Sequence, residues 1–148
     1  MPGYGIPESA AGMLDWGWAE QRLTSARIFM VATAERESGP HLMPVWGVWF
    51  EERLYFSTGD RTRKARSLAA DPRCSVATER ADEVVVIEGL ARRVSDPAEA
   101  ARVDEVYTEK YGTSPAVPGS SIFAVEPSRA FGLDESTFGT SATRWDFG

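Results

Sequence analysis

Short runs of β-branched and aromatic residues follow one another in this sequence, with only brief polar turns between them. The first three runs are Arg27–Ala34, Leu42–Phe50 and Leu54–Thr58. Strands joined by such short turns pair side by side as an antiparallel meander. The second run is apolar on both faces, as in a sheet that is closed on itself or covered on both sides. We therefore expect an antiparallel sheet around a buried interior.

The rest of the chain adds strands and helices in separate groups. Further strands are predicted at Cys74–Thr78, Val84–Val94, Ile122–Glu126 and Ala130–Asp134, with a short one at Ser141–Phe147. Helices are predicted over Ser9–Arg27, Arg61–Ala70 and Pro97–Lys110. We therefore expect an α+β fold of about seven strands and three helices. It is built on an antiparallel barrel rather than on the βαβ units of nucleotide-binding folds.

Local signals set the expected helix ends. Ser9 and Asp60 are the predicted caps of the first two helices. The second helix should stop at Asp71, because a residue before proline disfavours the α region. Pro97 suits the first turn of the third helix. No repeat or long linker interrupts the pattern, so residues 1–148 are expected to form a single domain.

Cysteine and histidine are scarce, which excludes several kinds of site. Cys74 is the only cysteine and His41 the only histidine, so an internal disulfide and a histidine-rich metal site are excluded. No apolar run approaches the ~20 residues of a membrane span. The first residues lack the basic start and apolar stretch of a secretory signal. We expect a metal-free protein in a cytoplasmic, reducing setting, without a membrane partner.

Positive charge is concentrated in one segment of an acidic chain. The formal net charge is −6, which argues against binding to nucleic acid. Residues 61–73 nevertheless carry five cations and a single acid, Asp71. These cations are Arg61, Arg63, Lys64, Arg66 and Arg73. The distribution favours a small anionic ligand over a polyanion.

Four of these cations lie at the predicted start of a helix, where the helix dipole disfavours positive charge. A bound anion would remove that conflict, because free backbone N–H groups and the cations would converge on it. Ser57 and Thr58, at the end of the preceding strand, would add hydroxyl donors. The segment therefore indicates a phosphate site. A solvated basic helix face that answers nearby glutamates is the alternative.

The order of motifs in this region resembles that of the pyridoxamine 5′-phosphate oxidase-like split-barrel flavoproteins. The resemblance rests on the strand pair Leu42–Thr58, the motif Thr62-Arg63-Lys64-Ala65, the later Asp71-Pro72-Arg73, and Val84–Gly89. It spans about residues 26–94. It implies a split barrel and a homodimer that holds FMN or the deazaflavin coenzyme F-420 between its subunits.

The same resemblance assigns roles to individual residues. Arg63 and Lys64 match the pair that holds the cofactor phosphate, and Ser57 and Thr58 match a strand end that touches the cofactor. The strand beside the cofactor ring matches Leu42–Gly47, which contains Pro44, Val45 and Trp46. Arg61 and Arg66 are extra cations suited to the polyglutamate tail of F-420. The short F-420 members also often end in a Thr-Arg-Trp sequence, as here at Thr143-Arg144-Trp145, so Arg144 and Trp145 either reach the cofactor at a subunit boundary or form a surface strand.

Two departures separate this chain from the vitamin B6 oxidases. Glu52 stands where those enzymes have a lysine for the substrate phosphate, and no histidine follows His41. Oxidation of pyridoxamine phosphate is therefore not expected. The resemblance instead implies hydride transfer between FMN or F-420 and a small organic substrate, and the sequence identifies no catalytic residue for it.

Several residues keep more than one interpretation. A non-catalytic protein that carries a flavin or binds haem is the alternative function, with His41 or Cys74 as the axial ligand of a haem. For His41 itself a surface or capping role is favoured over catalysis, and Cys74 is expected to be a small buried side chain. Trp46 and Trp49 fall on opposite faces of their strand, so at most one of them lines the cofactor site.

Overall fold

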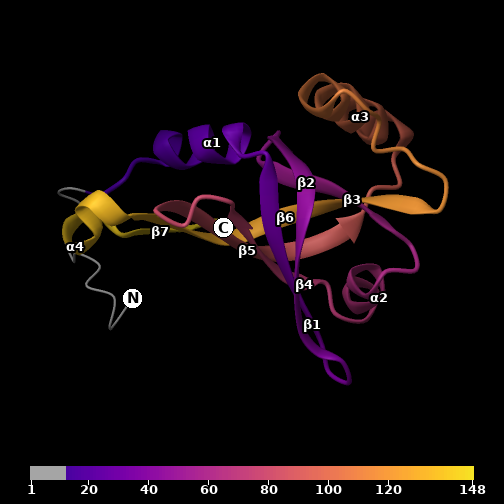
Figure 1. Ribbon diagram of the computed structural model, residues 1–148, viewed down its shortest axis with the longest axis horizontal. Coiled ribbons are helices and arrows are strands. Elements are labelled where there is room, and N and C mark those ends of the chain that lie inside the picture. Colours follow the sequence, from indigo (N-terminus) through magenta and orange to yellow (C-terminus); the bar gives the residue numbers. More distant parts are fainter. Residues whose placement is uncertain (1–12) are drawn as a thin grey trace.

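The computed structural model describes residues 13–148. Their seven strands form one antiparallel sheet that closes into a barrel. Its strands are β1 (Ile28–Glu35), β2 (Gly39–Phe50), β3 (Arg53–Gly59), β4 (Arg73–Thr78), β5 (Glu83–Arg93), β6 (Ser120–Asp134) and β7 (Thr143–Asp146). The strand order is β3-β2-β1-β4-β5-β6-β7, and an additional β3–β6 pairing closes the first six into the barrel (Figure 1). The expected α+β split barrel is confirmed.

Four α-helices surround the barrel in the described residues, one more than expected. They are α1 (Trp16–Ser25), α2 (Arg63–Ala70), α3 (Pro97–Tyr111) and the short α4 (Phe138–Ser141), which follows a 3-10 turn at Glu135–Thr137. Asp15 caps α1, and the proposed cap Ser9 lies outside the described residues. Asp96 caps α3, which ends at Gly112 in the left-handed conformation that glycine adopts readily. None of the described helices is long and apolar enough to cross a membrane.

The start of α2 differs from the prediction. The helix begins at Arg63, and its cap is Thr62, whose hydroxyl accepts a hydrogen bond from the Ala65 amide at 3.2 Å. Asp60 was expected to be the cap, and that prediction is wrong. Its carboxylate instead contacts Arg93 at 3.0 Å, so it joins the end of β3 to β5. The predicted stop at Asp71 is confirmed.

The two last predicted barrel strands are one continuous strand, β6. Pro127 lies in its middle, and it is accommodated by a bulge at which the pairing with β5 shifts between Glu88 and Gly89. A Cβ at Gly89 would approach the Glu126 carbonyl oxygen to 2.3 Å, so the two backbones can come this close only at a glycine. Proline cannot donate to the ladder, which is why the sequence predicted a break at this point.

The barrel interior holds the main hydrophobic core. Strand residues that point inward include Phe29, Val31, Leu54, Phe56, Val76, Val85 and Ile87, all nearly inaccessible to solvent. Helix α1 adds Ala19 and Leu23 at one end, and α2 adds Ala65 and Leu68 at the other. Cys74 belongs to this core, and burial raises the pKa of its thiol to about 12, so the expected inert buried cysteine is confirmed.

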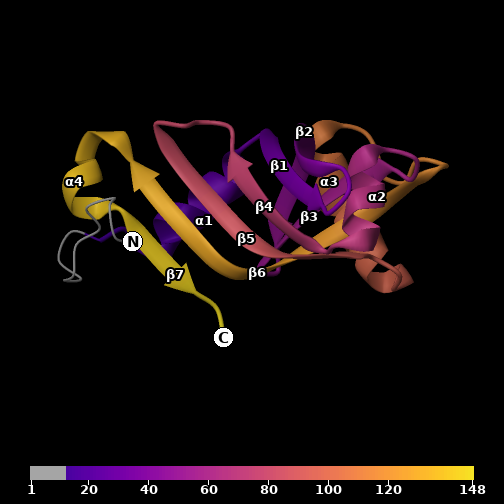
Figure 2. The same ribbon diagram turned by 90° about the horizontal axis from the view of Figure 1, so that it is seen from below.

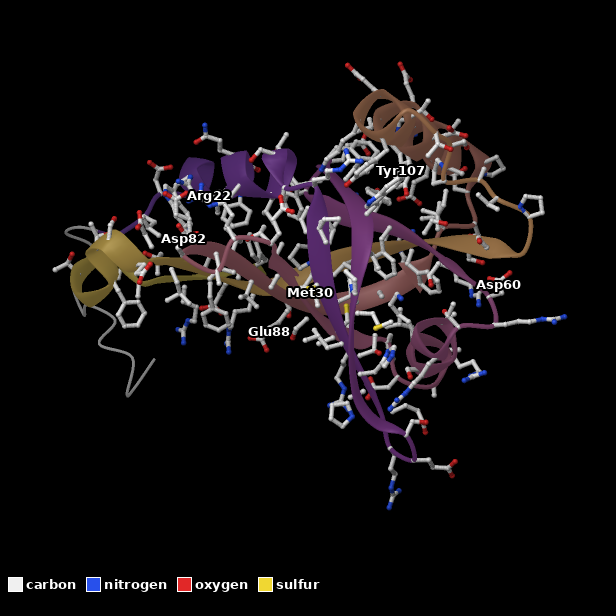
Figure 3. All side chains as sticks on the ribbon, in the orientation of Figure 1. Arg22, Met30, Asp60, Asp82, Glu88 and Tyr107 are labelled. Atoms are coloured by element: carbon white, nitrogen blue, oxygen red, sulfur yellow. The ribbon has the colours of Figure 1, made fainter. Side chains whose placement is uncertain are left out.

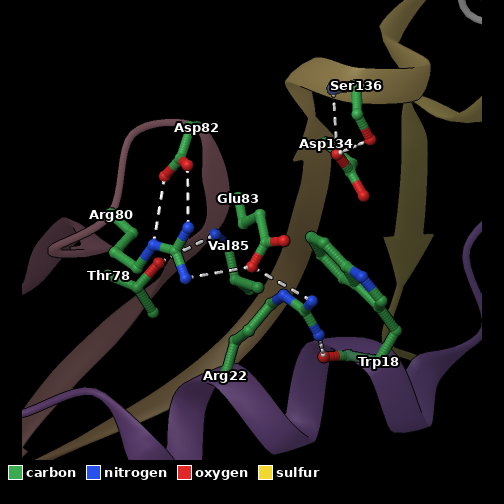
Figure 4. Close-up of polar contacts among 9 residues, drawn as sticks. All are labelled: Trp18, Arg22, Thr78, Arg80, Asp82, Glu83, Val85, Asp134 and Ser136. Carbon is green, nitrogen blue, oxygen red and sulfur yellow. Dashed lines mark hydrogen bonds and ion pairs between the residues drawn. The ribbon is translucent and has the colours of Figure 1, made fainter.

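A salt-bridge cluster holds α1 against the β4–β5 hairpin (Figure 4). The Arg22 guanidinium lies 3.9 Å from the centre of the Trp18 ring and 3.2 Å from the Glu83 carboxylate. Arg80 contacts both Glu83 and Asp82 across the hairpin. Every charge in this cluster therefore has a partner within it, which indicates a structural role.

Helix α3 covers only part of the outside of the barrel. Val48 and Tyr55, on β2 and β3, are buried beneath Val103 and Tyr107 of the helix. The helix is fixed there by Glu99, which accepts a hydrogen bond from the Tyr55 hydroxyl and pairs with Arg92, both at 2.8 Å. The Arg92 hydrogen bond lowers the pKa of the Glu99 carboxyl to about 2. This partly buried ion pair anchors α3 over one half of β2.

The remaining outer surface of the barrel has no helix over it, and we call it the bare face. The strand registers place its large apolar side chains on β1, β2, β5 and β6, with the small residues Ser75 and Ala77 of β4 between β1 and β5. The large apolar side chains are Ile28, Met30, Leu42, Pro44, Trp46, Val84, Val86, Leu90, Phe131 and Leu133. Figure 2 shows these strands with α1 and α3 behind them, and Figure 3 shows Met30 and Glu88 on the side away from α1.

Candidate functional site

The barrel is opened along one seam, between β2 and β3. The two strands pair only from Gly47–Phe56 to Phe50–Arg53 and then separate. Residues 39–46 of β2 therefore pair only with β1, and residues 57–59 of β3 pair only with β6. We call this opening the split. On the side of β2 that faces the split, the backbone of residues 39–46 has no strand partner, so its polar groups there are free to contact a ligand.

Helix α2 starts at the end of the split. Thr62, its cap, lies 3.1 Å from the Thr58 hydroxyl, which ties the helix start to the last residues of β3. The backbone amides of Arg63 and Lys64 have no hydrogen-bond partner among residues 13–148. Free amides at a helix N-terminus attract anions, and the first turn contains no acidic residue to occupy them. The helix start that the sequence assigned to a phosphate therefore has free backbone amides.

Lys64 is the most unusual residue of this group. Its side chain is only 7% exposed, and it has neither an ion-pair nor a hydrogen-bond partner in the described part of the chain. Burial lowers the pKa of its ammonium group, because the charged form loses water and gains no counter-charge. An ammonium group that loses part of its hydration without gaining a counter-charge is destabilising, and an anionic ligand would offset that cost.

Three further polar atoms lie buried without a partner around the same helix start. They are Arg63 Nε, His41 Nδ1 and Thr33 Oγ1. His41 and Thr33 are cross-strand neighbours on the inner side of β1 and β2. Burial and then the charges of Arg63 and Lys64 lower the pKa of His41, which keeps its imidazole neutral. His41, expected at the surface or as a cap, therefore lies beside the cation pair.

The other residues predicted to hold the phosphate have different surroundings in the structure. Thr58 is buried next to Thr62, and Arg61 is exposed at the loop before α2, where it lines a surface hollow with Gly59, Thr62 and Gly119. Arg63 donates to the Ser38 carbonyl oxygen at 2.6 Å, and so joins α2 to the β1–β2 turn. Ser57 instead donates to the Pro115 carbonyl oxygen at 3.0 Å, which engages its hydroxyl in the loop after α3.

The β2 residues predicted to run beside a cofactor ring alternate across the strand. Pro44 and Trp46 point to the bare face, whereas Val45 points into the core. Only the backbone of Val45 is therefore available to a ligand. Trp49 is buried in the core on the opposite face from Trp46, as the strand alternation predicted.

Beyond the split, two side chains of α3 bind the backbone of β2 where β1 has not yet begun. Strand β1 starts at Ile28, opposite Trp46, so Gly47 has no β1 partner. The Tyr111 hydroxyl accepts from the Gly47 amide at 2.9 Å and lies 2.7 Å from its carbonyl oxygen. Lys110 donates to that carbonyl at 2.9 Å and also to Ala26. These contacts fix the point at which the split begins, and sequence reasoning missed them.

The C-terminal residues Arg144 and Trp145 do not reach α2 within one chain. Trp145 packs against Trp16 at 5.2 Å between ring centres, so it covers the core. Arg144 lies on the outer side of β7, where it pairs with Asp146 at 3.1 Å. Within one chain these residues therefore form a strand, as the surface-strand interpretation predicted. Contact with a cofactor at a subunit boundary stays a prediction.

Glu52, the residue that departs from the vitamin B6 oxidases, lies far along the hairpin from α2. It occupies the β2–β3 turn, at the end opposite to the split, and has a positive φ of 60°. No group of histidine, cysteine, aspartate or glutamate in the described chain is arranged to hold a metal ion.

A split antiparallel barrel with a cationic helix start at its opening defines the class of this protein. A family model for pyridoxamine 5′-phosphate oxidase matches residues 18–134, and the chain belongs to that family. No curated protein sequence matches the chain.

Solved structures with the same fold have different roles. A conserved hypothetical protein from Mycobacterium tuberculosis aligns with a TM-score of 0.74 and 23% identity, over 87% of this chain and 90% of the other. An F420 reductase aligns with a TM-score of 0.61 and 22% identity, over 75% and 94%. A heme binding protein from Mycobacterium smegmatis aligns with a TM-score of 0.72 and 18% identity, over 90% and 59%. At these identities the similarity shows the shared fold.

Proposed function

We propose that this protein is an oxidoreductase that binds FMN or F-420 in the split and transfers a hydride between that cofactor and a small organic substrate. The observation that carries the proposal is Lys64, a residue that is only 7% exposed and whose ammonium group has no counter-charge in residues 13–148, beside free amides at a helix start. Both cofactors have a phosphate that would neutralise it. An F420 reductase among the proteins of the same fold supports the assignment.

The residues divide the site into two ends. Lys64, Arg63 and Thr58 would hold the phosphate, and the unpaired edge of β2 from Leu42 to Trp46 would lie along the ring. Trp46 lies five positions after His41, so the two ends of this part of β2 are roughly 16 Å apart along the strand. The cofactor supplies the hydride chemistry when bound, and the protein supplies binding, orientation and exclusion of water. Arg61 favours F-420 slightly, because its exposed guanidinium would meet a polyglutamate tail.

The bare face completes this proposal as the surface of a homodimer. Its apolar side chains come from four strands, and Leu42 is 58% exposed on β2, the strand that borders the split. Monomeric proteins rarely expose so large an apolar area. A second copy is the partner we propose, because the bare face borders the split, and a cofactor there would be enclosed by both subunits. Arg144, on the same outer side, would then be offered to the partner's site.

Haem binding is a second candidate function, and His41 is the observation that favours it. Its imidazole is kept neutral, which is the form that binds iron, and its Nδ1 atom is without a hydrogen-bond partner. Cys74 is a poor ligand, because its thiol is buried with a pKa of about 12. The absorption spectrum of the purified protein separates the two functions, since flavin, deazaflavin and haem have different bands.

Substitution of Lys64 tests the proposed phosphate end. Lys64→Met should weaken FMN or F-420 binding on the order of 10- to 150-fold, the cost of one charge-assisted hydrogen bond. The same variant should unfold at a higher temperature when no cofactor is present, because an apolar side chain replaces a buried charge. Cofactor fluorescence measures the first effect and thermal unfolding the second.

Arg102→Met is the matched control, because Arg102 is an exposed cation on α3 that pairs with Glu51. It should leave cofactor affinity unchanged. If Lys64→Met bound both cofactors as tightly as the parent protein, Lys64 would belong to the scaffold and the proposed phosphate site would be wrong.

A further inference from the structure

Where β2 emerges from beneath α3, an aromatic pair is exposed next to an arginine. The Trp46 ring lies parallel to the Tyr111 ring, with 4.7 Å between their centres and an interplanar angle of 1°. The Arg27 guanidinium carbon lies 5.2 Å from the centre of the Trp46 ring and 5.3 Å from that of Tyr111. Trp46 is 38% exposed in the single chain and lies at the margin of the bare face beside α3, so in the proposed dimer a ligand on this stack would lie at the edge of the subunit contact.

The charge of Arg27 is not neutralised within this cluster. Its side chain has no ion pair and no hydrogen bond in the described chain, whereas most other arginines there pair with a carboxylate. The nearest acid is Glu79, and both of its carboxylate oxygens accept hydrogen bonds from the backbone amides of Arg27 and Ile28. Lys110 adds a second cation nearby; burial lowers the pKa of its ammonium group to about 8, the Glu79 charge raises it and the Arg27 charge lowers it. The site therefore combines excess positive charge with an aromatic surface.

The cluster is held rigidly before any ligand arrives. The Tyr111 hydroxyl is bound to both backbone groups of Gly47, and Lys110 is bound to the carbonyl oxygens of Ala26 and Gly47. The Tyr111 ring cannot move away without breaking these contacts, and the Trp46 ring stacks on it. A preformed site loses little conformational entropy when it binds a ligand.

We infer that Arg27, Trp46 and Tyr111 form the subsite for the substrate, and that the substrate is a planar aromatic carboxylate. The aromatic surface matches a flat ring, and the guanidinium matches a carboxylate. This inference rests on the proposed function, because it places the substrate at Trp46, the ring end of β2, away from Lys64. The inference names the class of substrate that would lie against the exposed face of the cofactor ring.

The test uses probe molecules on the whole protein and does not require turnover. Benzoate is the probe, and benzamide is its neutral counterpart of the same shape. The indole N–H signals in an NMR spectrum report binding, with the Trp46 signal assigned from Trp46→Phe. We expect millimolar benzoate to shift the Trp46 signal, and benzamide to require at least about tenfold more, since a charge-assisted contact is lost.

Two variants and one control define the outcome. Arg27→Gln should remove the preference for benzoate over benzamide, and Trp46→Leu should weaken binding of both. Arg102→Gln, an exposed arginine on α3, should change neither. Glutarate, a flexible aliphatic carboxylate, should bind more weakly than benzoate. If glutarate binds as well as benzoate, or if Arg27→Gln keeps the preference, the subsite is not one for aromatic carboxylates.

The same titration is run with and without FMN or F-420, which separates this inference from the proposed function. If neither FMN nor F-420 binds but benzoate still shifts Trp46 through Arg27, the proposed function is wrong and the subsite stands. If either cofactor binds through Lys64 and benzoate has no effect on Trp46, the subsite is wrong and the proposed function stands.

Discussion

The two halves of β2 have the same outward pattern and opposite environments. The even-numbered residues from Leu42 to Phe50 all point away from the barrel interior, yet Leu42 is 58% exposed and Val48 is 1% exposed. The difference arises because α3 lies over the second half and no helix lies over the first. An outward apolar side chain on a strand therefore predicts a covering element, and the rest of the fold decides whether that element is a helix of the same chain.

Gly47 marks the boundary between these halves, and it is held by Tyr111 and Lys110 of α3. On one side of it β2 pairs with β3 and is buried, and on the other it borders the split and the bare face. The half that folding covers stabilises the chain. The half that it leaves open is the one we assign to the cofactor, the substrate and a second subunit.

Placing a charge in each half should give the largest contrast. Val48→Asp buries an unpaired carboxylate beneath α3 and should destabilise the fold by about 3–5 kcal/mol. Leu42→Asp places the same charge on the bare face and should leave the subunit folded but prevent dimer formation. Thermal unfolding measures the first effect and light scattering the second. If the parent protein is monomeric with cofactor bound, the bare face is not the dimer surface.

Removal of the Tyr111 hydroxyl should have an intermediate effect. Tyr111→Phe keeps the ring on Trp46 but leaves the Gly47 amide without its acceptor, which should cost about 1–3 kcal/mol of stability. It should also weaken cofactor binding, because the start of the split is no longer fixed. Val106→Ala, on the same helix and partly buried, is the control. It should reduce stability without a separate effect on cofactor affinity, and an equal loss of affinity in both variants would contradict the boundary role.

The smallest expected effect is a pH dependence in which the stability of the empty protein and its affinity for the cofactor change in opposite directions. Burial lowers the pKa of Lys64 in the folded protein below its value of 10.5 in the unfolded chain. Between these two pKa values the unfolded state binds more protons, so the stability of the empty protein rises with pH. Phosphate binding needs the charged ammonium group, so cofactor affinity should fall over the same interval.

The comparison with Lys64→Met isolates this contribution from other titrating groups. The higher unfolding temperature of the variant should be largest near pH 7 and should shrink as the pH approaches 10.5. A difference that stays constant with pH would mean that Lys64 is not the group responsible.

The sequence predicted the strands well because their signals are local. Alternation and short turns gave β1 to β5 to within a few residues, and Asp96 and Pro97 gave the start of α3. The errors were at positions where a local signal had a distant competitor. Asp60 has the right chemistry for a helix cap, but Arg93 binds it from β5. Pro127 usually interrupts a strand, but the bulge at Gly89 accommodates it.

The candidate site was predicted in part. The Arg63-Lys64 motif located the helix start, and the structure places both residues there with Thr58. His41 was singled out only as the single histidine of the chain, and nothing local marked Arg27 or Tyr111, because their importance comes from the residues that they contact. Trp145 illustrates the opposite case, since a motif pointed to the cofactor and the structure packs the ring against Trp16.

What the sequence alone determined is the barrel itself and the position of its cations, since strand periodicity and a charged helix start are properties of neighbouring residues. Only the tertiary structure decided that Lys64 is buried without a partner, that Tyr111 holds Gly47 across 64 positions of sequence, and that one half of β2 stays bare. Burial and covering depend on elements distant in the chain, and no local pattern encodes them.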